Sequence, residues 1–349
     1  MRTVIRGLLL LSLLTLTSCD PFSQPTSLLD EYLERVGRVL DQPVHYSELP
    51  EVPAYPRRRD LRLEPPEINL GLLDFLSLYG CELQEVIGEK ASGLGRVMQP
   101  GRRLNYELRF IAAGRLCLPK IEDEKLAKTL RQAIAAKRQS LPITFWNATW
   151  GSEEMARFFS RSNGPLPLAP DGALVANLQS DLNRLLNHHK RLNRSTLPTS
   201  VVGIADTYQR WQARSYAGQL IQSARRLTAR LNDAATVIEQ RMKRRPLCFQ
   251  GRSNHKAEIM RNVFFKVYAK RVQPYMATVQ RVRQNLVPLL AQLAEVQTTV
   301  MPEAFEPLYR QVLKQDVAGS LWQQLDAATQ RHTRQWQALL EQCGMRPQA

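Results

Sequence analysis

Apolar residues in the C-terminal part of the chain recur at intervals of three and four positions over long stretches. This is the spacing of one face of an α-helix, and it predicts helices over residues 204–245, over residues 256–300 and from residue 303 toward the end of the chain. Such seams are buried most readily against one another, which predicts an elongated antiparallel three-helix bundle similar to a coiled coil. Pro274 and Pro288 lie within the second helix, where we expect a kink or a break.

The N-terminal half of the chain is also helical in pattern. Helices are predicted over residues 68–97, 102–118, 122–138 and 152–161, and after Asp171. Ser152 and Asp171 are residues of the type that caps helix N-termini. Residues 141–145 are the candidate for a short strand. The sequence therefore predicts an all-α fold, with an N-terminal helical subdomain over residues 67–200 and the bundle over residues 201–349.

A proline-rich stretch precedes this subdomain. Residues 43–67 contain six prolines and follow a short predicted helix over residues 27–40. Proline fixes φ and removes a backbone donor, so the stretch favours an extended conformation. Its apolar side chains, among them Tyr55 and Leu61, are more numerous than a free linker needs. We therefore expect residues 19–66 to supply a helix and a strap that lies along the domain.

The first 19 residues carry the pattern of an export signal. Arg2 and Arg6 precede an apolar run over residues 7–14, which is too short for a membrane span of about 20 residues. The Leu-Thr-Ser-Cys that follows resembles the lipobox of bacterial lipoproteins, in which the cysteine becomes the first residue of the mature chain and carries the lipid. We predict a lipoprotein signal peptide over residues 1–18 and lipidation of Cys19. An ordinary secretory signal with an incidental cysteine is the alternative.

Lipidation of Cys19 would hold the protein on a membrane that it does not cross, because no later stretch approaches 18 consecutive apolar residues. Each buried methylene of an acyl chain contributes about 0.8 kcal/mol, so several chains make a stable anchor. Asp20 resembles the signal that keeps enterobacterial lipoproteins on the periplasmic face of the inner membrane. We predict a bacterial membrane lipoprotein that faces the periplasm, with the inner membrane favoured.

The chain is strongly basic, with 48 Lys and Arg against 32 Asp and Glu and a formal charge of +16. In a cytosolic protein this surplus would favour nucleic acid as the partner, but export removes that partner. Anionic lipid headgroups or an acidic envelope protein take its place, and each basic residue near an anionic surface contributes about 1 kcal/mol. The candidate contacts with an anionic surface are Arg241, Lys243, Arg244, Arg245, Arg252 and Lys256.

Once Cys19 carries lipid, Cys81, Cys117, Cys248 and Cys343 remain. Four cysteines in an oxidising compartment allow two disulfides and three connectivities. The midpoint between Cys81 and Cys117 lies beside the turn signal Gln-Pro-Gly at residues 99–101, so a helical hairpin would place these two side by side. Three antiparallel helices would bring Cys343 to the level of Cys248. We predict Cys81–Cys117 and Cys248–Cys343.

No residue constellation in the sequence indicates catalysis. The five histidines occur in neither His-Glu-x-x-His nor other zinc-site spacings, and we expect no metal and no cofactor. His189 and His332 fall on apolar seams and are predicted to be core histidines, whereas His188 is predicted to be solvated. Ser253 and Lys256 match the Ser-x-x-Lys of penicillin-binding enzymes only as a tetrapeptide.

Trp146 and Trp150 lie one helical turn apart. Two readings are open for them: a stacking platform for a glycan strand, or a packed aromatic pair between subdomains. The packed pair is favoured.

Several segments taken together resemble a known family. They are Cys19 with its lipobox, the proline-rich YPRRRDLRL over residues 55–63, LLDFLSLYGCELQEVIGEKASGLGRVM over residues 72–98, and LNYELRFIAAGRLCLP over residues 104–119. The resemblance is to an uncharacterised family of proteobacterial lipoproteins that is described only as a domain of unknown function. It implies a location and no activity.

From these observations we predict a lipid-anchored protein of the cell envelope that binds or scaffolds a partner without turnover. One alternative is an envelope enzyme that acts on peptidoglycan or lipid in a cleft near residues 146–161. Another is a nucleic-acid binder, which applies only if the signal peptide is false.

Overall fold

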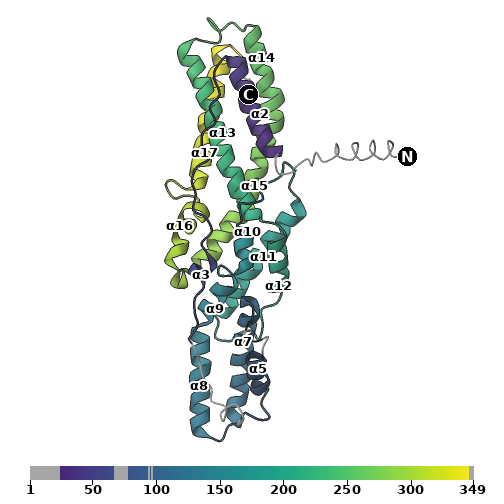
Figure 1. Ribbon diagram of the computed structural model, residues 1–349, viewed down its shortest axis with the longest axis vertical. Coiled ribbons are helices and arrows are strands. Elements are labelled where there is room, and N and C mark those ends of the chain that lie inside the picture. The colour runs from purple at the N-terminus through teal and green to yellow at the C-terminus, as the bar shows by residue number, and fades with distance from the viewer. Residues whose placement is uncertain (1–23, 67–77, 93–94, 96, 346–349) are drawn as a thin grey trace, which may run out of the picture.

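The computed structural model describes residues 24–66, 78–92, 95 and 97–345. Over these residues the fold is all-α, as predicted, and the only β pairing within them is an isolated bridge between Phe249 and Arg252. The molecule is elongated, and its longest helices run along the long axis (Figure 1). The predicted export signal and Cys19 lie outside the described residues.

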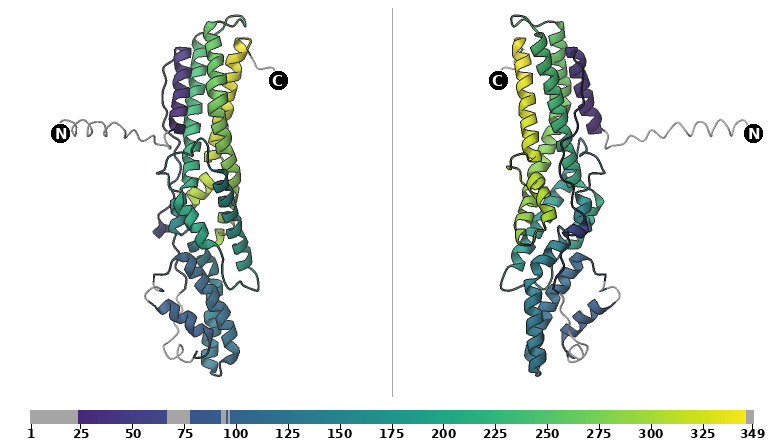
Figure 2. Two further views of the ribbon diagram at one scale, coloured as in Figure 1. Left: turned by 90° about the vertical axis from the view of Figure 1, so that its right-hand side faces the viewer. Right: turned by 60° about the vertical axis from the view of Figure 1, so that its left-hand side comes forward.

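One end of the molecule is a bundle of long helices. Its members are α2 (Gln24–Leu40), α13 (Tyr216–Arg244), the continuous rod of α14 (His255–Val263), η3 (Phe264–Val272) and α15 (Gln273–Glu295), and α17 (Leu321–Gln342). One end of the bundle, called the tip here, holds the loop between α13 and α14 (residues 245–254) and the end of α17. Helices α2, α13 and α17 run toward this tip, and the α14–α15 rod returns from it (Figure 2). The prediction of three helices is therefore incomplete, since α2 adds a fourth.

Helix α2 joins the bundle because its apolar residues form a continuous stripe. Leu29, Tyr32, Leu33, Val36 and Leu40 are spaced by threes and fours, and each is fully buried. The stripe packs against α13 and α14. The segment that follows the predicted lipid anchor is therefore part of the bundle core.

The predicted C-terminal helices occur with interruptions. The first is broken at Arg214 and Ser215, which separate α12 (Ile204–Ala213) from α13. Gly218 lies against the backbone of Ser160, where a Cβ would meet the Ser160 carbonyl oxygen at 1.9 Å, so α13 starts in close contact with the preceding part of the chain. In the second helix, Pro274 occupies the first turn of α15 after the π-helical η3, and Pro288 lies inside α15.

The third predicted helix begins with short turns in place of one continuous helix. These turns are η5 (Glu303–Phe305), α16 (Glu306–Leu308) and η6 (Tyr309–Leu313). A loop then leads to α17, whose N-terminus is capped by the Ser320 side chain.

The opposite end is built from α5 (Glu82–Ala91), α7 (Pro100–Cys117), η2 (Leu118–Lys120) and α8 (Glu124–Gln139), and the middle from α9 (Leu141–Ala148), α10 (Glu153–Phe158) and α11 (Gly172–Leu192) (Figure 1). The predicted caps Ser152 and Asp171 accept hydrogen bonds from the first turns of α10 and α11. Helix α11 packs along α15. The predicted helix over residues 68–97 is shorter in the structure, because α5 starts only after a turn at residues 78–81, and residues 67–77 lie outside the described part.

The strand predicted at residues 141–145 is wrong, because these residues form the first turns of α9. Pro142 occupies the first turn of this helix, where its missing N–H has no intrahelical partner to lose. Phe145, Trp146 and Ala148 are buried, so the apolar run reflects a buried helix.

The proline-rich strap is confirmed as a segment that lies along the domain, extended except for the single turn α3 (Arg58–Leu61). Asn147 holds it at Leu63, with Oδ1 accepting from the Leu63 N–H at 2.9 Å and Nδ2 donating to the Leu63 carbonyl at 2.6 Å. Arg161 donates to Val52 O and Arg225 to Pro50 O. The strap thereby satisfies its backbone groups with side chains of distant helices.

Candidate functional site

Both predicted disulfides are confirmed. Cys81 pairs with Cys117 at a Cα–Cα distance of 5.7 Å, and Cys248 pairs with Cys343 at 5.0 Å. The second disulfide joins the loop between α13 and α14 to the end of α17, and so closes the tip of the bundle.

The predicted anionic-surface contacts cluster around this tip but differ in exposure. Arg244, Arg245 and Arg252 are exposed. Lys243 is also exposed, and its ammonium lies 2.7 Å from the Glu239 carboxylate. Arg244, Arg245 and Arg252 are thus exposed and form no ion pair with another described residue.

Two candidates are engaged in other contacts. Lys256 forms an ion pair with Asp41 at the end of α2, and this hydrogen bond lowers the pKa of the Asp41 carboxyl. The prediction for Arg241 needs correction, because it is buried and its guanidinium donates to the Arg245 carbonyl. Arg241 follows Ala234 and Ile238 at helical spacing, which carries its stem into the bundle seam.

The burial of His332 agrees with the prediction, whereas the burial of the two histidines in α11 does not. His332 is fully buried, as predicted, and burial lowers its pKa to about 3. His188, predicted to be solvated, is buried, and its Nε2 lies 3.0 Å from the Val202 carbonyl. His189 is only half-buried, beside the ring of Phe145. The buried face of α11 is wider than its apolar seam, because the segment that leads into α12 lies against His188 while α15 packs along the same helix.

The segments considered for catalysis do not converge. The Ser253 hydroxyl donates to Glu258, whereas Lys256 is paired with Asp41. Within the described ranges, no group of three His, Cys, Asp or Glu side chains is arranged to hold a metal ion.

Trp146 and Trp150 are fully buried, with their ring centroids 5.2 and 4.7 Å from that of Phe305. They are the packed aromatic pair, and no face of either ring is open for stacking on a ligand.

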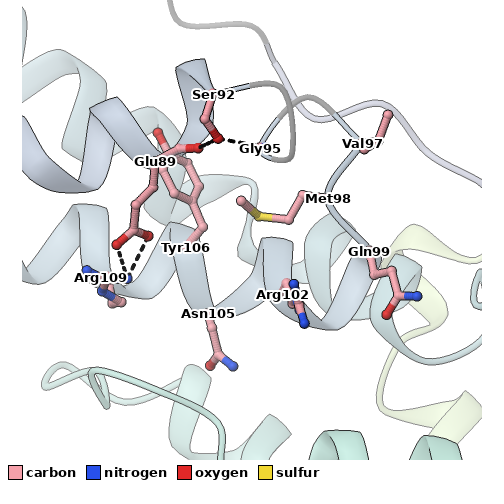
Figure 3. Close-up of a pocket in the computed structure, with 10 residues that line it drawn as sticks. All are labelled: Glu89, Ser92, Gly95, Val97, Met98, Gln99, Arg102, Asn105, Tyr106 and Arg109. Atoms are coloured by element: carbon pink, nitrogen blue, oxygen red, sulfur yellow. Dashed lines mark hydrogen bonds and ion pairs between the residues drawn. The ribbon is translucent and has the colours of Figure 1, made fainter.

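A cavity of about 530 Å³ lies between α5 and α7 at the end of the molecule opposite the tip. In Figure 3 the Glu89 carboxylate faces Arg109, whose Nη1 donates to both carboxylate oxygens, to Oε1 at 3.0 Å and to Oε2 at 2.8 Å. Tyr106, Met98 and Val97 supply the apolar part of the wall. Burial raises the pKa of Tyr106 to about 12, so its hydroxyl is neutral across the physiological range.

A second cavity of about 400 Å³ shares Met98 and Gly95 with the first and lies beneath the strap. Its wall draws on the strap and on α5, α7, α8 and α9. The charged and polar side chains that line it are Arg62, Glu64, Lys90, Arg103, Lys137, Thr144 and Asn147.

Two residues that line this second cavity, Arg103 and Lys137, belong to an ionic cluster. The Glu107 carboxylate accepts from Arg103 Nε and from Lys137 Nζ, and the Glu107 and Lys137 side chains are only 2% and 7% exposed. Burial lowers the pKa of Lys137, although Glu107 acts in the opposite direction. Lys137, Arg103 and Lys90 also lie 5.2 to 5.9 Å from the centroid of the Tyr106 ring, within reach of cation–π attraction.

These cavities were not predicted from the sequence. Arg103 and Glu107 stand four residues apart, which a sequence shows, but such pairs are usually solvated. The pair is distinguished from a solvated one only in the folded structure, where α8 brings Lys137, 30 residues after Glu107 in the chain, to the same carboxylate.

Comparison with known proteins gives one match. A family model described as a protein of unknown function (DUF3080) matches residues 29–347. No match was found among curated proteins or among solved structures. No helix in the described ranges has both the length and the apolar content that a membrane span requires.

Proposed function

Since the chain belongs to the DUF3080 family of proteins of unknown function, we propose a function from its own residues: a lipid-anchored binding or scaffolding protein of the bacterial cell envelope, on the periplasmic face of the inner membrane. The observation that carries the proposal is the position of α2, because this helix ties the predicted anchor to the bundle.

Cys19 precedes the first residue of α2, Gln24, by five positions. Five residues span at most about 17 Å, even when fully extended. Helix α2 is buried against α13 and α14, so it cannot swing away from the bundle without exposing its apolar stripe. A lipid on Cys19 would therefore keep the membrane surface within about 17 Å of Gln24.

This limit constrains the orientation on the membrane. Helix α2 has 17 residues, so it is about 25 Å long, and it ends at the tip of the bundle. An upright molecule with its tip on the membrane would hold Gln24 about 25 Å away, which exceeds the reach of the linker. The opposite end, with α5 and α8, lies farther still (Figure 2). We therefore expect the long axis to lie along the membrane.

The charge of the protein suits such an orientation. A side-on molecule brings many of its basic residues near the headgroups, and each contributes about 1 kcal/mol at an anionic surface. The exposed Arg244, Arg245 and Arg252 are the contacts at the tip end. An acidic envelope protein is the other partner that this surface could bind.

Lipidation is tested by metabolic labelling with a fatty acid. The wild-type chain should incorporate the label and fractionate with membranes, and Cys19→Ala should do neither. If Cys19→Ala retained the label, or if the wild-type chain fractionated as soluble, the anchor and the location would both be wrong.

The orientation is tested with fluorescent labels placed at Gln24, at Arg252 in the tip and at Arg131 in α8. The lipidated protein is reconstituted in vesicles whose lipids carry a headgroup quencher. We expect quenching at all three positions, because a long axis that lies along the membrane brings both ends of the molecule near the headgroups. Quenching at Arg252 without quenching at Arg131 would contradict the side-on orientation.

The headgroup contacts are tested with the chain from Asp20 onward, which carries no lipid. It should bind anionic vesicles in a salt-sensitive manner, because exposed charges are screened over about 8–10 Å. Equal binding to neutral vesicles, or no binding, would leave the acidic protein as the partner.

A further inference from the structure

The cavity beneath the strap collects cations from four separate parts of the chain. Arg62 comes from the strap, Lys90 from α5, Arg103 from α7 and Lys137 from α8. Among the described residues that line the cavity, Glu64 is the one with a carboxylate side chain.

Among the described residues, the cations of the ionic cluster outnumber the carboxylate that holds them. Glu107 is shared between Arg103 and Lys137, so one carboxylate faces two cations. Lys137 is almost fully buried, and a buried cation is costly unless opposite charge lies close by. A second anion in the cavity would therefore be stabilised by charges that the fold already holds in place.

The geometry also favours an anion with several acceptor oxygens. The cationic side chains come from four different elements, the strap, α5, α7 and α8, and such a set suits an anion that can accept from several donors at once. Pro100, at the start of α7, also lines the cavity, and the Gln99 side chain does not cap this helix. The positive end of the α7 dipole adds to the attraction for an anion.

We propose that the cavity bounded by Arg62, Lys90, Arg103 and Lys137 binds a phosphate group. The group belongs either to a small soluble phosphate ester or to the headgroup of a phospholipid. The inference is independent of the proposed function, since it requires neither lipidation of Cys19 nor a particular orientation on the membrane.

Binding is tested on the full-length chain in a neutral, phosphate-free detergent at physiological ionic strength. The probe is inorganic phosphate, followed by the line width of its ³¹P resonance and by calorimetry. We expect saturable binding, with a rise in melting temperature as phosphate is added.

Two single variants locate the site without disturbing the core. Arg62 is exposed and Lys90 half-buried, so Arg62→Gln and Lys90→Gln should fold with the wild-type helical content. Each should weaken phosphate binding by about tenfold, the scale of one charged hydrogen bond. Lys128→Gln is the matched control, because it removes the same charge from an exposed position on α8 and should leave binding unchanged.

Two further probes distinguish the sources of the phosphate. Glycerol 3-phosphate represents a soluble ester, and dihexanoyl phosphatidic acid below its micelle concentration represents a lipid headgroup with short chains. Tighter binding of the lipid probe, lost in Arg62→Gln, assigns the site to a headgroup, and equal binding of the two assigns it to a soluble ester. The proposal is overturned if phosphate does not bind saturably, or if Arg62→Gln and Lys90→Gln bind it as the wild type and Lys128→Gln do.

Discussion

The hydroxyl of Tyr32 lies 2.6 Å from Nε2 of His332, and this contact joins the first helix of the bundle to the last. Trp336 Nε1 donates to the Tyr32 oxygen at 2.7 Å. Because the indole can only donate, the hydroxyl hydrogen of Tyr32 is left to point at His332, whose Nε2 accepts it. His332 is therefore neutral, with its proton on Nδ1, which has no hydrogen-bond partner within the described part of the chain.

Tyr32→Phe should destabilise the protein by about 1–3 kcal/mol, because it removes a hydrogen bond between groups that have no access to water. Tyr46→Phe is the control. The Tyr46 hydroxyl also donates to a side chain, that of Glu34, but Tyr46 is 41% exposed and its loss should cost less than about 1 kcal/mol. Urea unfolding followed by circular dichroism measures both. Equal effects would mean that the buried contact contributes no more than the exposed one.

The buried His332 should make the protein less stable in acid. Its folded pKa, about 3, is far below the ordinary value of 6.5, so below pH 6.5 the unfolded chain binds a proton that the folded chain does not. The stabilisation is fully present above pH 6.5 and is lost as the pH falls toward 3. Between pH 7.5 and pH 5 this one group should remove about 2 kcal/mol.

Unfolding free energies of the wild type and of His332→Phe at several pH values isolate this effect, because the other groups titrate in both proteins. The variant should lose about 2 kcal/mol less than the wild type over this range. Parallel pH profiles for the two proteins would show that His332 titrates in the folded chain as it does in the unfolded chain.

Glu107→Gln should destabilise the protein by about 3–5 kcal/mol, because it leaves Lys137 buried without a full opposite charge. Glu89→Gln is the control. It breaks an ion pair with Arg109 whose side chains are 50% and 39% exposed, and it should cost less than about 1 kcal/mol.

The double variant Glu107→Gln, Lys137→Met should recover part of the loss, since it removes the uncompensated cation. A double variant less stable than Glu107→Gln would argue that Lys137 stabilises the fold through its cation–π contacts with Phe110 and Tyr106, which methionine cannot make.

The positions of the helices could be predicted from the sequence better than the elements against which each helix packs. Residues 27–40 were expected to be helical and form α2, but an apolar stripe indicates that a face is buried and not which element covers it. The same limit applies to His188, which lies off the apolar seam of α11 and is covered by the segment that leads into α12. The disulfides were within reach because helix direction and turn position together determine which cysteines meet.

The strand expected at residues 141–145 shows a different limit. A short apolar run has no period that distinguishes a buried strand from a buried helix. Phe145 and Trp146 are covered on several sides, so the run reflects depth in the core. The cavity beneath the strap was out of reach for a related reason, since its cations come from elements far apart in the sequence, such as Arg62 and Lys137.

Loss of the disulfide at the tip should affect stability more than loss of the one at the opposite end. Cys248 and Cys343 are separated by 95 residues, and Cys81 and Cys117 by 36. In the chain-entropy model these loops correspond to about 4.7 and about 3.8 kcal/mol, as upper values. Paired Cys→Ser variants at each disulfide avoid stray thiols. Under oxidising conditions the variant without Cys248–Cys343 should have the lowest melting temperature, and the variant without Cys81–Cys117 should lie between it and the wild type. When all three proteins are reduced, their melting temperatures should differ little.

The strap should detach locally when its clamp is removed. Asn147→Ala eliminates both hydrogen bonds to Leu63, and the partly buried backbone groups of that residue then lose these partners. We expect a loss of about 2–3 kcal/mol and faster hydrogen exchange over residues 61–66, with little change in α13 and α17. Asn183→Ala is the matched control, because the exposed Asn183 side chain donates only to the Gln179 carbonyl of its own helix. Hydrogen exchange with mass spectrometry resolves the strap from the bundle.

Two outcomes would contradict this prediction. Uniformly faster exchange across the strap and the bundle would mean that the two unfold as one unit. Unchanged exchange in the strap would mean that Tyr55, Leu61 and Leu63 hold it by apolar packing without the clamp.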